Sequence, residues 1–267
     1  IKFFSKFILR INKLNNMNEW DMSDIFLISY PKSGTSWLSL ILANILSEND
    51  KIKRRIDFFN VHDYIPDLHS NPQRIHQINP PRIIKSHESF KEFLCRVKLK
   101  GDQIRPRIIY LLRNGKDCMA SYYKYTSSLN KNYDKSFAQF LNDNKNKRLN
   151  WDIHVKEWLI KNKHLDKREI LIVTYEDLMK NTLSEINKIL KFIGMKVEKK
   201  VILKSIKNSD IKKIRVYQKK YGDGSNYSDP NYNFTRLNKK RNITNQLKDD
   251  LEKYYKKNIS IFKSLGY

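Results

Sequence analysis

A short polar loop after an apolar run carries residue types that bind an anion. The run Ile25–Tyr30 is followed, up to Trp37, by Pro-Lys-Ser-Gly-Thr-Ser-Trp. If a helix begins in this loop, its first backbone N–H groups and the positive end of its dipole point at the loop. One lysine and three hydroxyl groups stand around the glycine, Gly34: Lys32, Ser33, Thr35 and Ser36. We therefore expect a phosphate or a similar anion to bind here.

The position of the lysine distinguishes this loop from the P-loop of nucleoside triphosphatases. That loop needs a glycine, four residues, and then Gly-Lys followed by Ser or Thr. Here Lys32 stands two residues before the glycine, not directly after it. The only Gly-Lys pair of the chain, Gly115-Lys116, is followed by Asp117 and has Tyr110 where the first glycine should be. A nucleoside-triphosphatase site is therefore not expected.

A second site of the same form follows another apolar run. The run Arg107–Leu112 ends in Arg113, and Ser121 lies one to two helical turns into the next segment. An arginine and a serine in these places can hold a second phosphate, because ligands of open α/β sheets bind just outside the carboxyl ends of the strands. Together the two sites predict a ligand with two well-separated anionic groups.

Short apolar runs between helical segments predict the fold. Near-continuous Ile, Leu and Val runs are typical of a parallel sheet that helices cover on both faces. We expect strands at Ile25–Tyr30, Arg82–Ser86, Arg107–Leu112 and Ile170–Thr174. We expect helices over Ser36–Leu46, from Thr182 (a capping box with Glu185) to before Gly194, and from Thr244. The fold class is α/β: a single domain, residues 1–267, with a central, mostly parallel sheet flanked by helices, and residues 1–20 as an N-terminal helical extension.

The composition limits the partners and the compartment. The chain has 53 Lys and Arg against 28 Asp and Glu, a net charge of +25 that favours anionic partners: nucleic acid, a membrane, an acidic polymer or a phosphorylated cofactor. No apolar stretch reaches the roughly 18–20 residues that span a bilayer, so stable membrane insertion is not expected. Two cysteines, Cys95 and Cys118, are too few for a disulfide framework or a cysteine zinc site. A cytoplasmic location is expected.

Four motifs, taken together, resemble those of the cytosolic-type sulfotransferases. The loop Tyr30–Trp37 is similar to the 5′-phosphosulfate loop of that family. Lys85-Ser86-His87 resembles its Lys-Thr-His active-site element, and Arg113 with Ser121 resembles its 3′-phosphate motif. Thr174-Tyr175-Glu176-Asp177 resembles its adenine-side Tyr-Glu-Asp. The motifs occur in the order of the family and at compatible spacings, over residues 25 to 265.

The resemblance implies a P-loop-like phosphosulfate-binding loop and the cofactor 3′-phosphoadenylyl sulfate (PAPS), whose product is PAP, without a metal. It implies that Lys32 contacts the bridging oxygen and the leaving 5′-phosphate. The residues implied to cradle this phosphate are Ser33, Gly34, Thr35, Ser36 and Trp37. Arg113 and Ser121 would hold the 3′-phosphate, Tyr175 would hydrogen-bond the adenine, and Ser209 lies where the family has another adenosine contact.

The chain departs from the family near its C-terminus. The family closes over the 3′-phosphate with an Arg-Lys-Gly segment and a Gly-Asp-Trp-Lys-like segment, and neither occurs between Phe234 and Thr244. The basic residues that can take this role are Arg236, our first choice, and its rivals Lys239, Lys240 and Arg241. The family's dimer motif is also altered, since its Val and Glu are Asn245 and Asp249 here, and the oligomeric state stays open.

Lys32, Lys85 and His87 are the candidate catalytic residues. Sulfuryl transfer is an in-line displacement in which, by analogy with phosphoryl transfer, charge develops on the peripheral and leaving oxygens. Lys32 and the helix N-terminus supply positive charge at the leaving phosphate. His87 is the candidate base, because imidazole accepts a proton near neutral pH, and Lys85, on the same side of the strand, can stabilise the transferring group. Two alternatives stay open: His87 bonded to the backbone at a strand end, and Glu88 as the base.

The acceptor is the least defined part of the site. Aromatic walls suit a small, partly apolar molecule, so a small-molecule acceptor is expected, with an anionic polysaccharide as an alternative. The candidate wall residues are Phe58, Phe59, His62, Tyr64, Tyr123, Tyr125, His154, Tyr227 and Tyr232. Of these, His154 lies on an amphipathic helix, and we expect it to be structural, although that helix resembles one that borders the acceptor pocket of the family.

Two other functions compete with sulfuryl transfer. The net charge of +25 fits a basic nucleotide- or nucleic-acid-binding protein that performs no chemistry. A kinase is the third hypothesis and would require magnesium. With four motifs in register, we expect a sulfotransferase and no nucleic-acid partner.

Overall fold

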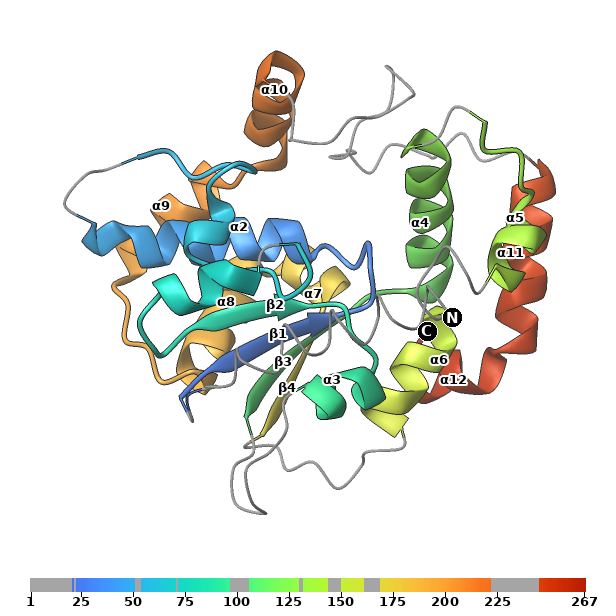
Figure 1. Ribbon diagram of the computed structural model, residues 1–267, viewed down its shortest axis with the longest axis horizontal. Helices are drawn as coiled ribbons and strands as arrows, with labels where there is room; N and C mark the ends of the chain where they lie inside the picture. The colour runs from blue at the N-terminus through green and yellow to red at the C-terminus, as the bar shows by residue number, and fades with distance from the viewer. Residues whose placement is uncertain are drawn as a thin grey trace, which may run out of the picture.

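A parallel four-stranded sheet, in the order β2-β1-β3-β4, lies at the centre of the computed structural model (Figure 1). The strands are β1 (Ile25–Ser29), β2 (Ile83–Ser86), β3 (Arg107–Leu112) and β4 (Ile170–Thr174). The α/β fold class and the four predicted strands are confirmed. The structure describes residues 21, 23–50, 54–70, 72–96, 106–129, 132–143, 150–160, 169–221 and 245–267. The predicted helical extension, residues 1–20, lies outside these ranges.

The helices of the described ranges lie on both sides of the sheet (Figure 1). On one side lie α2 (Thr35–Leu46), α7 (Tyr175–Lys180), α8 (Thr182–Phe192), α9 (Lys199–Asn208) and α10 (Ile211–Tyr221). On the other side lie α3 (Phe90–Arg96), α4 (Gly115–Leu129), α5 (Phe137–Asn142), α6 (Trp151–Val155), α11 (Asn245–Lys257) and α12 (Ile259–Ser264). Short 3₁₀ turns span Ser47–Asn49, Val61–Asp63 and Pro72–Gln77, and a π-turn over Lys156–Ile160 extends α6.

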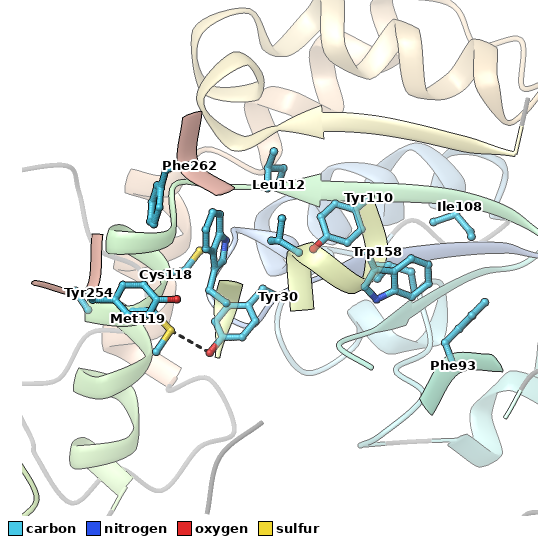
Figure 2. Packing of buried hydrophobic residues seen from close by; sticks show 14 of the residues in the cluster. Tyr30, Phe93, Ile108, Tyr110, Leu112, Cys118, Met119, Trp158, Tyr254 and Phe262 are labelled. Atoms are coloured by element: carbon cyan, nitrogen blue, oxygen red, sulfur yellow. Dashed lines mark hydrogen bonds between the residues drawn. The ribbon is translucent and has the colours of Figure 1, made fainter. Parts of the chain in front are cut away.

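Successive residues of the central strands pack into two hydrophobic clusters, one on each face of the sheet. Phe26 and Ile28 of β1 belong to the cluster with α3, α4, α6 and α12, whereas Ile25 and Leu27 belong to the cluster with α2, α8 and α9. This alternation is the two-residue period of a strand. Figure 2 shows the first cluster, in which the Tyr30 hydroxyl donates to Met119 Sδ at 3.2 Å. Buried apolar surface on both faces therefore holds the sheet in place.

The predicted helix boundaries agree with the structure except at one cap. The helix predicted over Ser36–Leu46 is α2, and Gly194 follows α8 with φ 77°. The predicted capping box at Thr182 is wrong: Thr182 is already inside α8, and its hydroxyl donates to Leu178 O at 2.8 Å. The reason is that α7 ends just before, at Lys180, and offers that carbonyl. Thr244 lies outside the described ranges, and α11 is described from Asn245.

The carboxyl ends of the strands bring the four motifs to one edge of the sheet. All three strand pairs are parallel, and Leu27 of β1 lies opposite Lys85 of β2 and Ile109 of β3. The polar loop follows β1, the His87 segment follows β2, and Arg113 and Tyr175 follow β3 and β4. Because parallel strands end together, these segments meet at the same edge.

Candidate active site

The polar loop between β1 and α2 turns sharply so that α2 begins inside it. Lys32 has φ 70° and Gly34 has φ 98°, both in the left-handed region. Gly34 is the N-cap of α2, and its carbonyl accepts hydrogen bonds from Trp37 N at 3.0 Å and Leu38 N at 3.2 Å. The N–H groups of the first helical turn have no acceptor within the helix. The loop therefore offers backbone donors and a helix dipole to an anion, as predicted from its sequence.

Tyr175 explains why position 34 is a glycine. A Cβ built on Gly34 would lie 2.5 Å from Cδ2 of the Tyr175 ring, so that any side chain at position 34 would collide with it. Tyr175 is the first residue of α7, whose N-cap Thr174 accepts a hydrogen bond from Asp177 N at 3.0 Å. The cap sets where α7 begins and thus where the ring lies. The predicted adenine-side motif therefore touches the predicted phosphate loop.

Arg113 joins the two predicted anion sites. Its Nη1 donates to Lys32 O at 3.0 Å, and its guanidinium carbon lies 4.2 Å from the centroid of the Tyr175 ring. The side chain is 10% exposed, and its Nε has no hydrogen-bond partner among the described residues. Burial of an unpaired guanidinium nitrogen is costly unless a ligand satisfies it. Arg113 is thus placed to bind an anion beside the polar loop.

Trp151 of α6 supports the backbone of Arg113, a contact that the sequence patterns did not indicate. The indole Nε1 donates to Arg113 O at 3.0 Å. The ring also packs on Gly115, where a Cβ would lie 2.5 Å from Trp151 Cε3. Glu176 accepts a hydrogen bond from Asn114 N at 3.1 Å on the other side of this turn. The turn after β3 is therefore fixed by contacts from α6 and α7.

The hydroxyl groups of the polar loop contact the protein around it. Ser33 Oγ lies 3.5 Å from Cys118 Sγ, and Thr35 Oγ1 lies 2.5 Å from Ser29 Oγ. Burial raises the pKa of the Cys118 thiol to about 11, so this thiol is neutral. Ser36 is half-buried, as is Ser121 on α4. The hydroxyl groups that were predicted to bind the phosphate therefore also help to fix the shape of the loop.

The Lys32 side chain extends over an aromatic ring. Its Nζ lies 4.3 Å from the centroid of the Tyr125 ring of α4, a cation–π distance. Tyr125 is a predicted acceptor-wall residue and Lys32 a predicted catalytic residue, so the structure brings these two together.

Trp37 and Ser209 also lie together. The Trp37 indole donates to Ser209 O at 3.0 Å, and its ring centroid lies 6.3 Å from that of Tyr175. Ser209 is buried, and its hydroxyl accepts a hydrogen bond from Asn44 Nδ2 at 3.2 Å. Both residues were predicted to contact the nucleotide, and that role stays a prediction.

His87 is bound to the backbone through one ring nitrogen. Its Nδ1 lies 2.8 Å from Ser29 O and 3.2 Å from Ser29 Oγ. A carbonyl oxygen only accepts, so Nδ1 carries the proton and Nε2 carries the lone pair of the neutral ring. The two sequence interpretations of His87 are therefore compatible, because the backbone bond sets the tautomer that a base acting through Nε2 needs.

Two side chains donate to the carbonyl oxygen of Glu88, the residue after His87. His154 Nε2 lies 3.0 Å and Trp158 Nε1 lies 2.9 Å from Glu88 O. Tyr110 OH lies 2.8 Å from His154 Nδ1, which accepts because Nε2 is the donor. His154 is 2% exposed, so the structure places this predicted acceptor-wall residue inside the protein. The Glu88 carboxylate, the alternative base, pairs with Arg96 of α3.

Lys85 is paired with a residue outside the motifs, Asp67. Lys85 Nζ lies 2.7 Å from Asp67 Oδ2, and both side chains are mostly buried. Burial lowers the pKa of the nearby His62, with a contribution from the Lys85 charge. His62 Nδ1 donates to Ile65 O at 3.1 Å, which again leaves the lone pair on Nε2. A group of ionisable side chains thus gathers where β2 ends.

The other predicted acceptor-wall residues separate into different places. Phe58 and Tyr64 pack against the hydrophobic cluster on the α2 side, and Tyr123 packs against the opposite cluster. Phe59 is 52% exposed. The remaining predictions lie outside the described residues: Tyr227, Tyr232, Arg236, Lys239, Lys240 and Arg241.

The described residues contain neither a metal-binding cluster nor a membrane-spanning helix. They contain no group of three or more His, Cys, Asp and Glu side chains that could hold a metal ion. Within the same ranges, every helix is too short or too polar to cross a membrane.

Comparison with known proteins identifies the family of the chain. Residues 22–263 match the sulfotransferase domain. Sulfotransferase 1E1 of Bos taurus is 29% identical over 233 residues, which cover 80% of this chain and 73% of the relative. The structure of the mouse sulfotransferase SULT7A1 complexed with PAP matches with a TM-score of 0.55 at 23% identity. The match covers 74% of this chain and 67% of the mouse chain. Retinol dehydratase in complex with androsterone and PAP has a TM-score of 0.61 at 18% identity, covering 90% and 82%.

The structural similarities define an α/β fold of the kind seen in sulfotransferases. The match over residues 22–263 shows the family. The chain belongs to the sulfotransferase domain family, and it is therefore an enzyme that transfers sulfuryl groups. The resemblance drawn from the four sequence motifs is confirmed.

Proposed function

We propose that this enzyme transfers the sulfuryl group of PAPS to a hydroxyl or an amine of a small-molecule acceptor. One observation carries the proposal: Arg113 donates to Lys32 O at 3.0 Å and keeps a buried, unpaired Nε at the same edge of the sheet. A single ligand with two anionic groups fits this arrangement. A nucleotide with phosphates at both its 5′ and 3′ positions is such a ligand, and PAP is bound in the related mouse structure.

The residues of the strand-end edge fit PAPS. In this proposal the loop after β1 and Lys32 hold the 5′-phosphosulfate, because helix N-termini and lysines bind phosphates. Arg113 and Ser121 hold the 3′-phosphate, with Arg113 supplying the planar fork that suits phosphate oxygens. Tyr175 and Trp37 form the aromatic side of the nucleotide site. When bound, PAPS supplies the activated sulfuryl group.

Three side chains would then perform the chemistry. His87 takes the proton of the acceptor on Nε2, the nitrogen that its bond to Ser29 O leaves as the base. Lys32 stabilises the negative charge that develops on the leaving phosphate. Lys85 stabilises the sulfuryl oxygens during transfer.

A small-molecule acceptor is supported by relatives. The related retinol dehydratase structure contains androsterone. The wall residue Tyr125 contacts the candidate catalytic residue Lys32, whose Nζ lies over its ring. The identity of the acceptor and a cytoplasmic location stay predictions.

Thermal unfolding with added nucleotide tests the binding half of the proposal. PAP at one hundred times its Kd should raise the melting temperature by about 5 °C or more, as expected for about 2.7 kcal/mol of binding to a chain of this size. Lys32→Ala should reduce this shift, whereas Lys188→Ala, on the surface of α8, should not. A larger shift with ATP or duplex DNA than with PAP would instead favour the binding protein without chemistry.

Turnover tests the catalytic half. A screen of phenols, sterols, amines and sugars with radiolabelled PAPS should identify an acceptor. His87→Ala should then lower turnover at least a hundredfold, the usual contribution of a general base, while the thermal shift with PAP stays that of the wild type. Full turnover in His87→Ala would remove His87 as the base.

A further inference from the structure

Asp67 is a buried carboxylate of the candidate active site that lies outside all four motifs. It forms a parallel β-bridge with Lys85. Two backbone hydrogen bonds fix this pairing, from Leu68 N to Lys85 O and from Lys85 N to Pro66 O, both at 2.9 Å. The backbone itself therefore holds Asp67 against the strand that leads to His87.

The Asp67 carboxylate is fully engaged. Its Oδ2 accepts from Lys85 Nζ at 2.7 Å, and its Oδ1 accepts from His69 N at 2.8 Å and Ser70 N at 3.2 Å. The side chains of Asp67 and Lys85 are only 7% and 13% exposed. A buried pair of this kind fixes the position of the lysine, since separating it would leave two unpaired charges.

The charge of Asp67 also interacts electrostatically with that of His87. Burial alone would raise the pKa of Asp67, but the charges of Lys85 and His87 and the hydrogen bonds hold this pKa well below its usual range. Asp67 is therefore ionised near neutral pH. Interactions between two charges are mutual, so the carboxylate stabilises the protonated form of the imidazole.

We propose that Asp67 is a positioning residue of the active site: its carboxylate holds Lys85 in place and stabilises the imidazolium that forms when His87 accepts a proton. This inference rests on the proposed roles of His87 and Lys85. It assigns to the irregular segment before β2 an electrostatic function that the sequence motifs do not contain.

Other ionisable groups surround this position and must be considered in any titration. They include His62 and His69 on the segment of Asp67, Glu88 with its partner Arg96, and His154 of α6. His154 bonds the Glu88 carbonyl, and the Arg96 charge balances Glu88. Of the two acidic residues named here, Asp67 and Glu88, Asp67 is therefore the one whose partner, Lys85, is a candidate catalytic residue.

NMR titration of the histidine side chains tests the proposal. In protein labelled with carbon-13 histidine, the His87 resonance is assigned by its absence in His87→Gln. Asp67→Asn should move the titration midpoint of His87 to lower pH by about one unit, the usual effect of removing a neighbouring opposite charge. Asp63→Asn is the matched control on the same segment, because Asp63 pairs with Arg54 and Arg74 instead. An equal midpoint in wild type and Asp67→Asn would overturn the proposal.

A wild-type measurement covers the case in which Asp67→Asn does not fold. The carboxyl carbon-13 resonance of Asp67 should stay that of a carboxylate at pH 4, and Lys85→Gln should make it titrate at higher pH. A wild-type Asp67 that is half protonated near pH 4 would overturn the proposal. Neither measurement needs PAPS or an acceptor. A failed PAP thermal shift would therefore contradict the proposed function alone, and an unchanged His87 titration would contradict the role of Asp67 alone.

Discussion

The ring of Tyr175 occupies the space that a side chain at Gly34 would need. A Cβ on Gly34 would lie 2.5 Å from the ring, and the same ring lies 4.2 Å from the guanidinium carbon of Arg113. One aromatic side chain therefore packs against both Gly34 of the loop after β1 and Arg113 of the turn after β3, and it fixes their spacing.

Gly34→Ala should abolish the thermal shift with PAP. The methyl group would collide with Tyr175, and alanine is strained at φ 98°. We expect a loss of unfolding free energy of about 2 kcal/mol and displacement of Tyr175 from the loop. Gly194→Ala is the control, because it has φ 77° and its nearest atom is Arg107 Nη1 at 3.8 Å. It should destabilise the protein but keep PAP binding; loss of binding in both variants would contradict the role of Tyr175.

Arg113→Lys should weaken PAP binding although it keeps the charge. Lysine cannot both donate to Lys32 O and present a second nitrogen to a phosphate, as the guanidinium can. We expect Kd to rise about 10- to 100-fold, measured by calorimetry, as for the loss of one charged hydrogen bond. Arg107→Lys loses a comparable bond to Phe192 O at the opposite end of β3 and should leave Kd unchanged. Equal Kd values in wild type and Arg113→Lys would show that Arg113 does not bind the nucleotide.

Tyr110→Phe should destabilise the protein by about 1–3 kcal/mol, because it leaves the buried His154 Nδ1 without its donor. His154 holds the Glu88 carbonyl, so turnover should also fall while PAP binding stays unchanged. Tyr30→Phe loses only a bond to the Met119 sulfur, a weak acceptor, and should cost less. Urea unfolding measures both variants. A larger cost for Tyr30→Phe would contradict the importance of the His154 contact.

Asp67→Asn should change how stability depends on pH. The pKa of Asp67 is lower in the folded protein than in the unfolded chain, so the ionised carboxylate stabilises the fold above pH about 4 and this contribution is lost as the pH falls further. At pH 7 the variant should be about 3 kcal/mol less stable, as for a broken buried ion pair. Urea unfolding at several pH values should show this difference shrinking below pH 4. A difference that is constant with pH would contradict the assignment.

The two cysteines should differ in reactivity. Cys95 is exposed, whereas Cys118 is buried and its pKa is raised to about 11. Because the thiolate is the reactive form, iodoacetamide at pH 7.5 should add once to the folded protein and twice to the unfolded protein, as counted by mass spectrometry. Modification of Cys118 in the folded protein would mean that the contact between Ser33 and α4 opens in solution.

The sequence allowed the strands and the motif positions to be predicted, because these depend on local patterns. Apolar runs of four to six residues identified all four strands. Polar residues that follow such runs must lie at the carboxyl edge of a parallel sheet, so the neighbourhood of Arg113, His87 and Tyr175 was also predictable.

The supporting contacts could not be predicted, because they join segments that no local pattern relates. Asp67 lies in an irregular segment 18 residues before Lys85, and only their β-bridge brings them together. Trp151 reaches Arg113 across 38 residues. The error at Thr182 has a different origin, because its hydroxyl bonds a carbonyl only four residues earlier, in the last turn of the preceding helix.

The bond between Arg113 and Lys32 joins residues 81 positions apart in the chain. During refolding, the two halves of the proposed nucleotide site meet only when β3 pairs with β1. Nucleotide affinity should therefore emerge late, together with closure of this long loop, whose entropy must be overcome first. Binding of the nucleotide would then show, during refolding, when the sheet is complete. A nascent chain released before β3 is synthesised would not bind the nucleotide.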